Sequence, residues 1–318
     1  MTCPYDMMQR AVDIVNSSPH PTNKIAATLC GVERGDHPFI ISETNYWPGE
    51  IESKIGRGVK IGNSSGTIHA ETACLLHAPC TKDASLFITD PPCPNCAKNM
   101  TEAGIKALYI DHKGFKKDFA QRRGDQFTSM SMRIFAAAGI PVYEVHRKER
   151  RLDKVLEIAE NYTPPLENPA ELVSLKSGIN KSVFEKNIER AKDKYKDAPF
   201  ALALAEQGAG NFVAFSAASH PAVGYTHEDD LSKNGKYSFI LQPINRILMA
   251  GKYYGLKFDP RFIYSSRPPT ARELINLVGA NYHRLHVGHD QKARDEFGPL
   301  AMEQLQAANI LSFLNFPA

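Results

Sequence analysis

The first 147 residues alternate between helical and strand-like spacings of apolar side chains. Apolar positions recur at a helical interval over residues 5–16. Two β-rich runs follow at residues 24–32 and 38–42, and the polar turn between them predicts an antiparallel hairpin. Residues 43–66 are polar, rich in Gly, Asn and Ser, and without periodicity, so we expect a long loop with a functional role.

Short helices and strands alternate after this loop. The predicted elements are helix 71–77, strand 84–89, helix 93–103, strand 104–110, helix 128–138 and strand 141–145. Strands that alternate with helices after an opening hairpin are typical of a three-layer α/β/α domain. Ligands bind beyond the carboxyl ends of strands in such sheets, and the loop after residue 89 follows such an end.

A charge run and a proline-rich stretch separate this region from the rest of the chain. The charges span residues 146–151, a helix is predicted over 152–160, and the prolines that follow cannot continue it. We therefore predict a first domain at residues 1–147, a linker at 148–175 and a second domain at 176–318.

The second half repeats the pattern of the first at an offset of 173 residues. Phe39-Ile40 aligns with Phe212-Val213, and His69 and Glu71 align with Gln242 and Ile244. A chance match of strand and helix patterns is the alternative interpretation. If the alignment is correct, the fold is duplicated in tandem and the second copy has lost the chemical groups that the first copy carries at these positions.

Composition describes an ordinary globular protein. At 318 residues the chain has the length of two average domains. Hydrophobic residues make up 42% and charged residues 23%, and the net charge of +3 gives little support for a nucleic-acid partner. The amino terminus lacks a signal-peptide pattern, and no run approaches the ~18 apolar residues of a membrane helix. We expect a cytoplasmic protein without a membrane partner.

Two short motifs carry the candidate chemistry. His69-Ala70-Glu71 has the form H-x-E, and Pro92-Cys93-Pro94-Asn95-Cys96 has the form P-C-x-x-C. All six cysteines lie in the first third of the chain, which suits a metal site better than a disulfide framework. His69, Cys93 and Cys96 would bind zinc (Zn2+) as three ligands, and the open fourth position would admit water, as in catalytic zinc sites.

Glu71 is then free to move protons, because it is close to the metal without serving as a ligand. Ala70 is small, so its backbone can approach a substrate amino group closely. The alternative interpretation is a closed structural zinc site, which needs a fourth ligand such as Cys74 or Cys80. Cys74 is on the same predicted helix as His69 and is more typical of a core cysteine.

These motifs resemble the cytidine and deoxycytidylate deaminase superfamily over residues 1 to about 147, with residues 67–96 carrying most of the likeness. The resemblance implies a mixed five-stranded sheet flanked by helices. It also implies that Asn45 contacts the sugar or base of the substrate, although a turn-forming role explains this asparagine equally well. A degenerate second copy is similar in arrangement to the two-domain cytidine deaminases.

The resemblance implies a zinc-dependent hydrolase that converts a cytosine nucleoside or nucleotide (cytidine, deoxycytidine or dCMP) to the uracil product with release of ammonia. Its partner is then a small molecule, and a homo-oligomer is compatible with this class. One alternative is a nucleic-acid-editing enzyme similar to the tRNA adenosine deaminases, for which Lys113, Lys116, Lys117, Arg122 and Arg123 form a candidate basic patch. The other is a non-catalytic, zinc-stabilised binding protein.

Overall fold

The computed structural model describes residues 3–33, 36–115, 125–167, 169–227, 229, 238–288 and 292–316. The chain forms two compact units, and neither is one continuous stretch of sequence. Unit 1 comprises residues Met1–Tyr46, His69–Glu167 and Pro221–Leu241. Unit 2 comprises Trp47–Ile68, Asn168–His220 and Gln242–Ala318.

Unit 1 is built on a six-stranded mixed sheet in the order β2-β1-β5-β6-β7-β8. The hairpin strands β1 and β2 are antiparallel, β1 is antiparallel to β5, and β5, β6 and β7 are parallel to one another. The strands span β1 Ala26–Glu33, β2 His37–Thr44, β5 Ser85–Ile88, β6 Ala107–Asp111, β7 Val142–His146 and β8 Arg151–Leu156.

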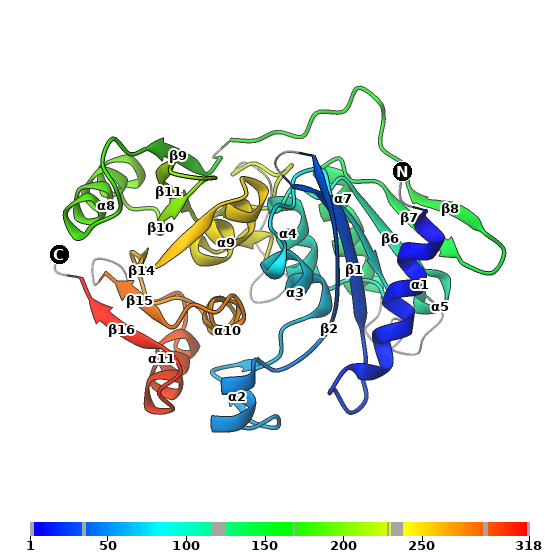
Figure 1. Cartoon of the computed structure of the whole chain (residues 1–318), viewed down its shortest axis with the longest axis horizontal. Helices are drawn as coiled ribbons and strands as arrows, with labels where there is room; N and C mark the ends of the chain where they lie inside the picture. The colour runs from blue at the N-terminus through cyan, green and yellow to red at the C-terminus, as the bar shows by residue number, and fades with distance from the viewer. Residues whose placement is uncertain are drawn as a thin grey trace. The chain divides into compact units, whose positions relative to one another are not determined.

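Helices cover both faces of this sheet, as the predicted three-layer class requires (Figure 1). On one face, α1 packs Met7 and Met8 against Cys30, Phe87 and Val145. On the other face lie α3 and α4, and α7 packs against α4. The helices span α1 Pro4–Ile14, the 3-10 turn η1 Val15–Ser17, α3 Ala70–His77, α4 Pro94–Glu102, α5 His112–Phe115 and α7 Asp125–Ala137.

Unit 2 has its own six-stranded mixed sheet in the order β16-β15-β14-β10-β11-β9. Its strands span β9 Glu171–Ser174, β10 Phe200–Glu206, β11 Phe212–Ala218, β14 Lys257–Ser265, β15 Arg284–Val287 and β16 Ser312–Asn315. The helices span α8 Lys181–Tyr195, α9 Pro243–Tyr253, α10 Ala271–Gly279 and α11 Phe297–Ala307. The core under α8 gathers Phe184, Ile188, Leu202, Tyr264 and their neighbours.

The two sheets share the same five-strand core. Strands β2-β1-β5-β6-β7 of unit 1 correspond to β11-β10-β14-β15-β16 of unit 2, in the same order and with the same antiparallel and parallel pairings. His69 and Gln242 both occupy the N-cap position of the helix that follows the hairpin, α3 and α9, with the same extended backbone. The expected tandem duplication of an α/β fold is therefore confirmed.

Each sheet carries one more strand than the five expected, and the sixth strands lie on opposite edges: β8 beside β7, and β9 beside β11. The predicted helix at 152–160 was wrong, because this segment forms β8 and hydrogen-bonds to β7. Residues Arg147–Arg150 form a tight turn in which Arg150 has φ 47°, so the chain returns along the open edge of β7. Pairing with this edge overrides the local helical pattern.

The expected linker at 148–175 is correspondingly shorter, because its two ends belong to β8 and β9. The predicted loop at 43–66 also contains regular structure, namely α2 Gly49–Lys54 and a small hairpin of β3 Lys60–Ile61 and β4 Ser64–Ser65. Among the described residues, no helix has the length and apolar character that crossing a membrane requires.

Candidate active site

Two helix starts in unit 1 bring the predicted metal ligands together. His69 is the N-cap residue of α3, and Cys93 is the N-cap residue of α4. Cys96 lies in the first turn of α4, where its backbone N–H donates to the Cys93 Sγ at 3.4 Å. Pro94 at the first helical position has the fixed φ that a helix start favours, so the local sequence places both thiols on one helix end.

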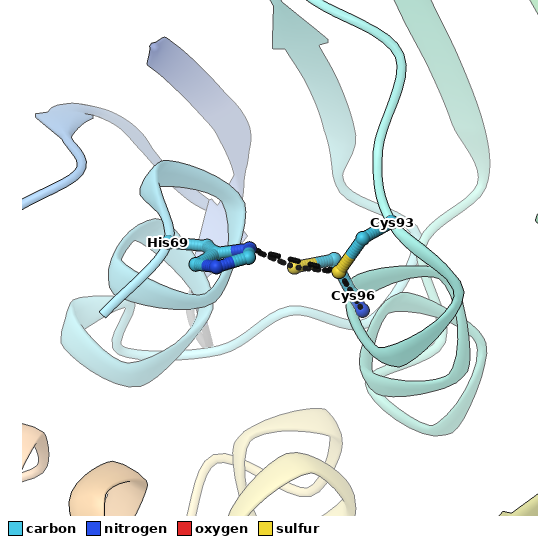
Figure 2. Close-up of side chains that lie close together, drawn as sticks. All are labelled: His69, Cys93 and Cys96. Carbon is cyan, nitrogen blue, oxygen red and sulfur yellow. Dashed lines mark hydrogen bonds between the residues drawn. The ribbon is translucent and has the colours of Figure 1, made fainter. Parts of the chain in front are cut away.

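The three ligand atoms are close enough to share one metal ion (Figure 2). His69 Nδ1 lies 3.6 Å from Cys93 Sγ and 3.3 Å from Cys96 Sγ, and the two sulfurs are 3.4 Å apart. Tetrahedral zinc with Zn–S of about 2.3 Å and Zn–N of about 2.0–2.1 Å places its ligand atoms roughly 3.5–3.8 Å apart. The donor set of one imidazole and two thiols therefore fits zinc in both chemistry and spacing.

The thiol pair is prepared for metal binding by its surroundings. The pKa of Cys93 lies well below its usual value, first because of its side-chain hydrogen bond with Cys96 and then because the charge of His69 is nearby. The pKa of Cys96 is raised in turn, first by the same hydrogen bond with Cys93 and then by burial. A thiolate at a helix N-terminus is further stabilised by the helix dipole.

Residues behind the ligands hold them in place. Asn99 Nδ2 donates to Thr72 Oγ1 at 3.3 Å, and Thr72 Oγ1 lies 3.7 Å from Cys96 Sγ. Ser131 on α7 donates to the carbonyl of Pro92 at 2.9 Å, directly before Cys93. Such outer contacts orient metal ligands and tune their basicity.

Glu71 combines deep burial with an open carboxyl oxygen. Its side chain is 2% exposed, and Oε2 has no hydrogen-bond partner among the described residues. Burial raises the pKa of this carboxyl to about 7, while the charge of His69 acts in the opposite direction. A carboxyl group that exchanges its proton near neutral pH, within the same buried site as the ligands, is suited to general acid–base catalysis.

The two other cysteines considered as a fourth ligand lie elsewhere. Cys74 donates to the Ala27 carbonyl at 3.4 Å and is fully buried, as expected for a core cysteine. Neither Cys74 nor Cys80 joins His69, Cys93 and Cys96 in the group of close ligand atoms found in the described part of the chain. The geometry thus favours three protein ligands and an open position.

Residues 1–111 match the cytidine and deoxycytidylate deaminase zinc-binding region. This match confirms the resemblance expected from the two motifs. The "Uncharacterized deaminase in luxG 3'region" of Aliivibrio fischeri is 32% identical over 77 residues, and the match covers 24% of this chain. The chain spans 50% of the length of that curated relative.

Two solved structures are also similar. The dCMP deaminase from the cyanophage S-TIM5 in complex with dCMP and dUMP is 22% identical, with a TM-score of 0.28, and the match covers 43% of this chain and 93% of that one. The apo form of the same enzyme is 24% identical, with a TM-score of 0.26, and the match covers 38% and 91% of the two chains.

The predicted substrate residues of the deaminase region are both buried. Ala70 is the first residue of α3, between His69 and Glu71, and is fully buried. The Asn45 amide is engaged within unit 1: its Oδ1 accepts from Ser18 Oγ at 2.8 Å and from Ile25 N at 2.9 Å, and its Nδ2 donates to the Asn23 carbonyl at 2.9 Å. Asn45 thus orders the loop before β1, and its role toward a substrate stays a prediction.

His20 is a candidate site residue that the motifs did not indicate. Its Nδ1 accepts hydrogen bonds from the backbone N–H groups of Asn23 at 2.9 Å and Thr22 at 3.3 Å. Burial lowers the pKa of His20, and the nearby charge of His69 lowers it further. It belongs to the loop that Asn45 orders, and its only signal in the sequence is its place in the turn-rich stretch before the hairpin.

The corresponding helix starts of unit 2 are joined by a carboxylate. Thr270 caps α10 as Cys93 caps α4, and Glu273 occupies the place of Cys96, three residues on. Glu273 Oε2 accepts from the backbone N–H and the hydroxyl of Thr270, both at 2.8 Å, and Oε1 accepts from Ile244 N at 2.9 Å. Burial raises the pKa of this carboxyl, while these hydrogen bonds act in the opposite direction. The carboxyl links α9 and α10 at the place where unit 1 has the predicted metal ligands.

We expect Glu273→Ala to destabilise the protein. The change leaves the buried Ile244 N–H and the Thr270 N–H without their acceptor, and each such loss costs about 1–3 kcal/mol. The free energy of unfolding of the full chain, measured in denaturant, should fall by about 2–4 kcal/mol. Glu303→Ala, at an exposed position on α11, is the control and should leave it nearly unchanged. Equal stabilities of the two variants would show that the carboxylate does not hold the two helices.

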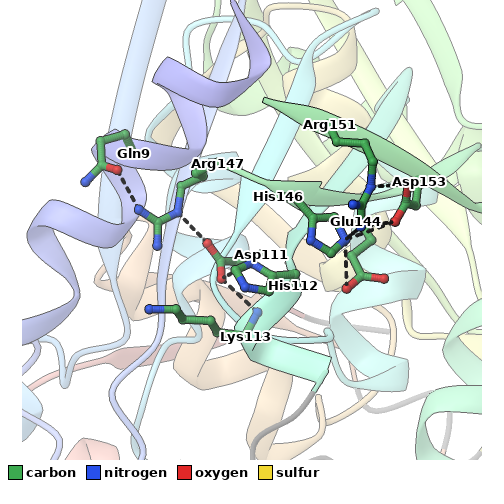
Figure 3. A network of polar contacts seen from close by, with 9 residues as sticks. All are labelled: Gln9, Asp111, His112, Lys113, Glu144, His146, Arg147, Arg151 and Asp153. Carbon is green, nitrogen blue, oxygen red and sulfur yellow. Dashed lines mark hydrogen bonds and ion pairs between the residues drawn. The ribbon is translucent and has the colours of Figure 1, made fainter. Parts of the chain in front are cut away.

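A second group of ligand-type residues lies on the β7–β8 hairpin (Figure 3). Glu144 and Asp153 face each other across the two strands, with His146 beside them. Arg151 donates to both carboxylate oxygens of Asp153 at 2.9 Å, and its Nη2 lies 3.0 Å from His146 Nε2. The guanidinium offsets the charge of one of the two carboxylates, that of Asp153, so we interpret the group as an ion-pair network that stabilises the hairpin.

Of the five residues in the candidate basic patch for nucleic acid, the structure describes only Lys113. Lys113 lies on α5, and its backbone N–H donates to Asp111 at 2.9 Å. Lys116, Lys117, Arg122 and Arg123 lie outside the described residues.

Proposed function

We propose that this protein is a zinc-dependent hydrolase that deaminates a cytosine nucleoside or nucleotide, with cytidine, deoxycytidine and dCMP as the candidate substrates. The observation that carries the proposal is the buried Glu71, with one free carboxyl oxygen, in the same site as His69, Cys93 and Cys96. A purely structural zinc site does not require a buried carboxyl such as Glu71, whose pKa is raised to about 7. The family description supplies the substrate class, since it names cytidine and deoxycytidylate.

His69, Cys93 and Cys96 would hold the zinc, which supplies Lewis acidity and a nucleophilic water at neutral pH. Glu71 would accept the proton of that water and pass it to the ring nitrogen next to the amino-bearing carbon. The same carboxyl would then accept the remaining proton of the added hydroxyl and deliver it to the departing amine, so that the carbonyl forms as the carbon–nitrogen bond breaks and ammonia leaves as a neutral molecule. The backbone at Ala70, directly before Glu71, would border the amino group of the base.

We further propose that unit 2 performs no such chemistry. Gln242, Thr270 and Glu273 stand at the three ligand positions and Ile244 at that of the proton carrier, and these residues bond to one another or are buried in the core. On this proposal the protein acts on a small molecule in the cytoplasm and has one working centre per chain.

A substrate panel tests the proposal. Purified full-length protein of measured zinc content is incubated with cytidine, deoxycytidine, dCMP, adenosine, guanine and a single-stranded oligonucleotide, and ammonia release is recorded. We expect turnover of at least one cytosine compound. Activity on the oligonucleotide alone, with binding that weakens steeply as salt rises, would support the nucleic-acid-editing alternative instead. A zinc-loaded protein that turns over none of these compounds would contradict the enzymatic assignment.

A further inference from the structure

Each half of the sequence contributes one segment to the compact unit that the other half forms, and the two segments occupy equivalent places in the repeat. Residues Trp47–Ile68 come from the first half of the sequence but belong to unit 2, and Pro221–Leu241 come from the second half but belong to unit 1. Each segment lies between the second hairpin strand of its own half and the helix that Gln242 or His69 caps. In the first half, the exchanged segment ends one peptide bond before the metal-binding histidine.

Within unit 2, side chains of α10 and α11 form hydrogen bonds with the segment Trp47–Ile68. Arg272 on α10 donates through Nη1 to the carbonyl of Thr67 and through Nη2 to the hydroxyl of Ser64. Gln304 on α11 accepts from Gly62 N at 2.7 Å and donates to the Lys60 carbonyl at 3.1 Å. These contacts fix the backbone from β3 to the residue two positions before His69.

The backbone of this segment also packs closely against α10 and α11 at Gly62. Gly62 has φ 54°, and a Cβ at this position would meet the carbonyl oxygen of Phe297 at 2.5 Å and the side chain of Ala271 at 3.0 Å. Only glycine fits here, because any other side chain would push the segment away from α10 and α11. Trp47 and Ile51 fill the space behind Gly66 and are buried.

Within unit 1, side chains of α4 and α7 contact the other exchanged segment, Pro221–Leu241, in a similar way. Lys98 on α4 is 3% exposed and donates through Nζ to the carbonyls of Ser238 at 2.7 Å and Ile240 at 3.2 Å. Arg133 on α7 lies over the ring of Phe239, with its Cζ 5.3 Å from the ring centroid. In both units, therefore, a cation on the equivalent helix, α4 or α10, donates to the carbonyl two residues before the N-cap residue.

We propose that Arg272 is a positioning residue for the metal centre, and that this is a role the second half keeps although its own centre is lost. The guanidinium makes two directed hydrogen bonds from a half-buried site, and a rigid fork of this kind fixes backbone better than a flexible ammonium. Because Thr67, Ile68 and His69 are consecutive, holding the Thr67 carbonyl limits the positions that the His69 backbone can adopt. The catalytic unit would then depend on α10 and α11 for the placement of one ligand.

Mutation of Arg272 in the full-length chain tests this proposal, which builds on the proposed function but has readouts of its own. The variants are Arg272→Ala and the conservative Arg272→Lys, with Arg261→Ala as the control, since Arg261 pairs on the surface with Asp259 in the same unit. Zinc release to a chelator is timed, and amide hydrogen exchange is measured over residues 60–68. Turnover of the substrate from the panel is recorded where there is one.

We expect Arg272→Ala to release zinc on the order of ten-fold faster, as losses of residues that orient metal ligands usually do. Exchange over residues 60–68 should rise, and kcat should fall more than KM changes. Arg272→Lys should restore part of the zinc retention, and Arg261→Ala should match the wild type in every measurement. Unchanged zinc release and unchanged exchange in Arg272→Ala would overturn the positioning role, whether or not the wild type deaminates cytosine. Absence of turnover in a wild-type protein that shows the zinc effect would count against the proposed function only.

Discussion

Glu71→Gln is expected to abolish turnover while leaving zinc content unchanged. The substitution keeps the shape of the side chain but removes its ability to accept and return a proton, and a general acid–base residue contributes about 10²–10⁴-fold to rate. Since Glu71 would handle every proton transfer of the reaction, we expect a loss of at least about 10³-fold in kcat. The proposed ligands His69, Cys93 and Cys96 are unchanged in this variant, so zinc measured by atomic absorption should stay at the wild-type ratio.

The matched control for this prediction is Glu144→Gln. Glu144 is a carboxylate of the same unit, but it lies in the ion-pair network of the β7–β8 hairpin. This variant should keep wild-type kcat. A Glu71→Gln enzyme with full activity would refute the proposed mechanism, and a Glu71→Gln protein without zinc would show that Glu71 has a structural role that the geometry does not indicate.

Cys96→Ser should have the second largest effect, through the metal itself. A serine hydroxyl is a poor zinc ligand, because it is not deprotonated at neutral pH and is harder than a thiolate. The change also removes the thiol whose hydrogen bond with Cys93 lowers the pKa of Cys93, so both cysteine positions are weakened together. We expect the purified variant to hold little zinc and to show no turnover.

Cys74→Ala and Cys80→Ser are the controls for the cysteine prediction. Both cysteines lie outside the ligand group, although Cys74 is on the same helix that His69 caps. The two variants should keep the wild-type zinc ratio, with Cys74→Ala losing some stability because it leaves a small cavity in the core. Zinc loss in either control would revive the interpretation of a closed site with four ligands.

The local sequence was sufficient to predict the residues that the structure brings together at the candidate metal site. The H-x-E and P-C-x-x-C motifs each lie at a helix start, and Pro94 at the first position of α4 favours the second of these starts. The strand and helix periods also predicted the α/β class and the repeat that sets Gln242 at the place of His69. These features depend on interactions within a few residues, which a pattern along the chain records.

Sheet edges were not predictable in the same way. Residues 152–160 have a helical pattern, yet Arg151–Leu156 form β8 because the edge of β7 offers unpaired backbone groups to the returning chain. The sixth strand of unit 2 similarly comes from the expected linker. Edge pairing depends on which backbone is nearby in space, and apolar spacing carries no information about it.

The sequence by itself thus predicted the fold class and the duplication, which the structure confirms, because both are encoded by residue type and local spacing. The ligand set and the proton carrier come from the same local motifs and stay predictions. Only the tertiary structure decided which helices hold each segment. It showed that Arg272 and Gln304 bind the stretch before His69, that Lys98 binds the equivalent stretch before Gln242, and that Glu273 joins α9 and α10. These contacts join residues 29 to 242 positions apart, and such distant pairs are brought together by packing.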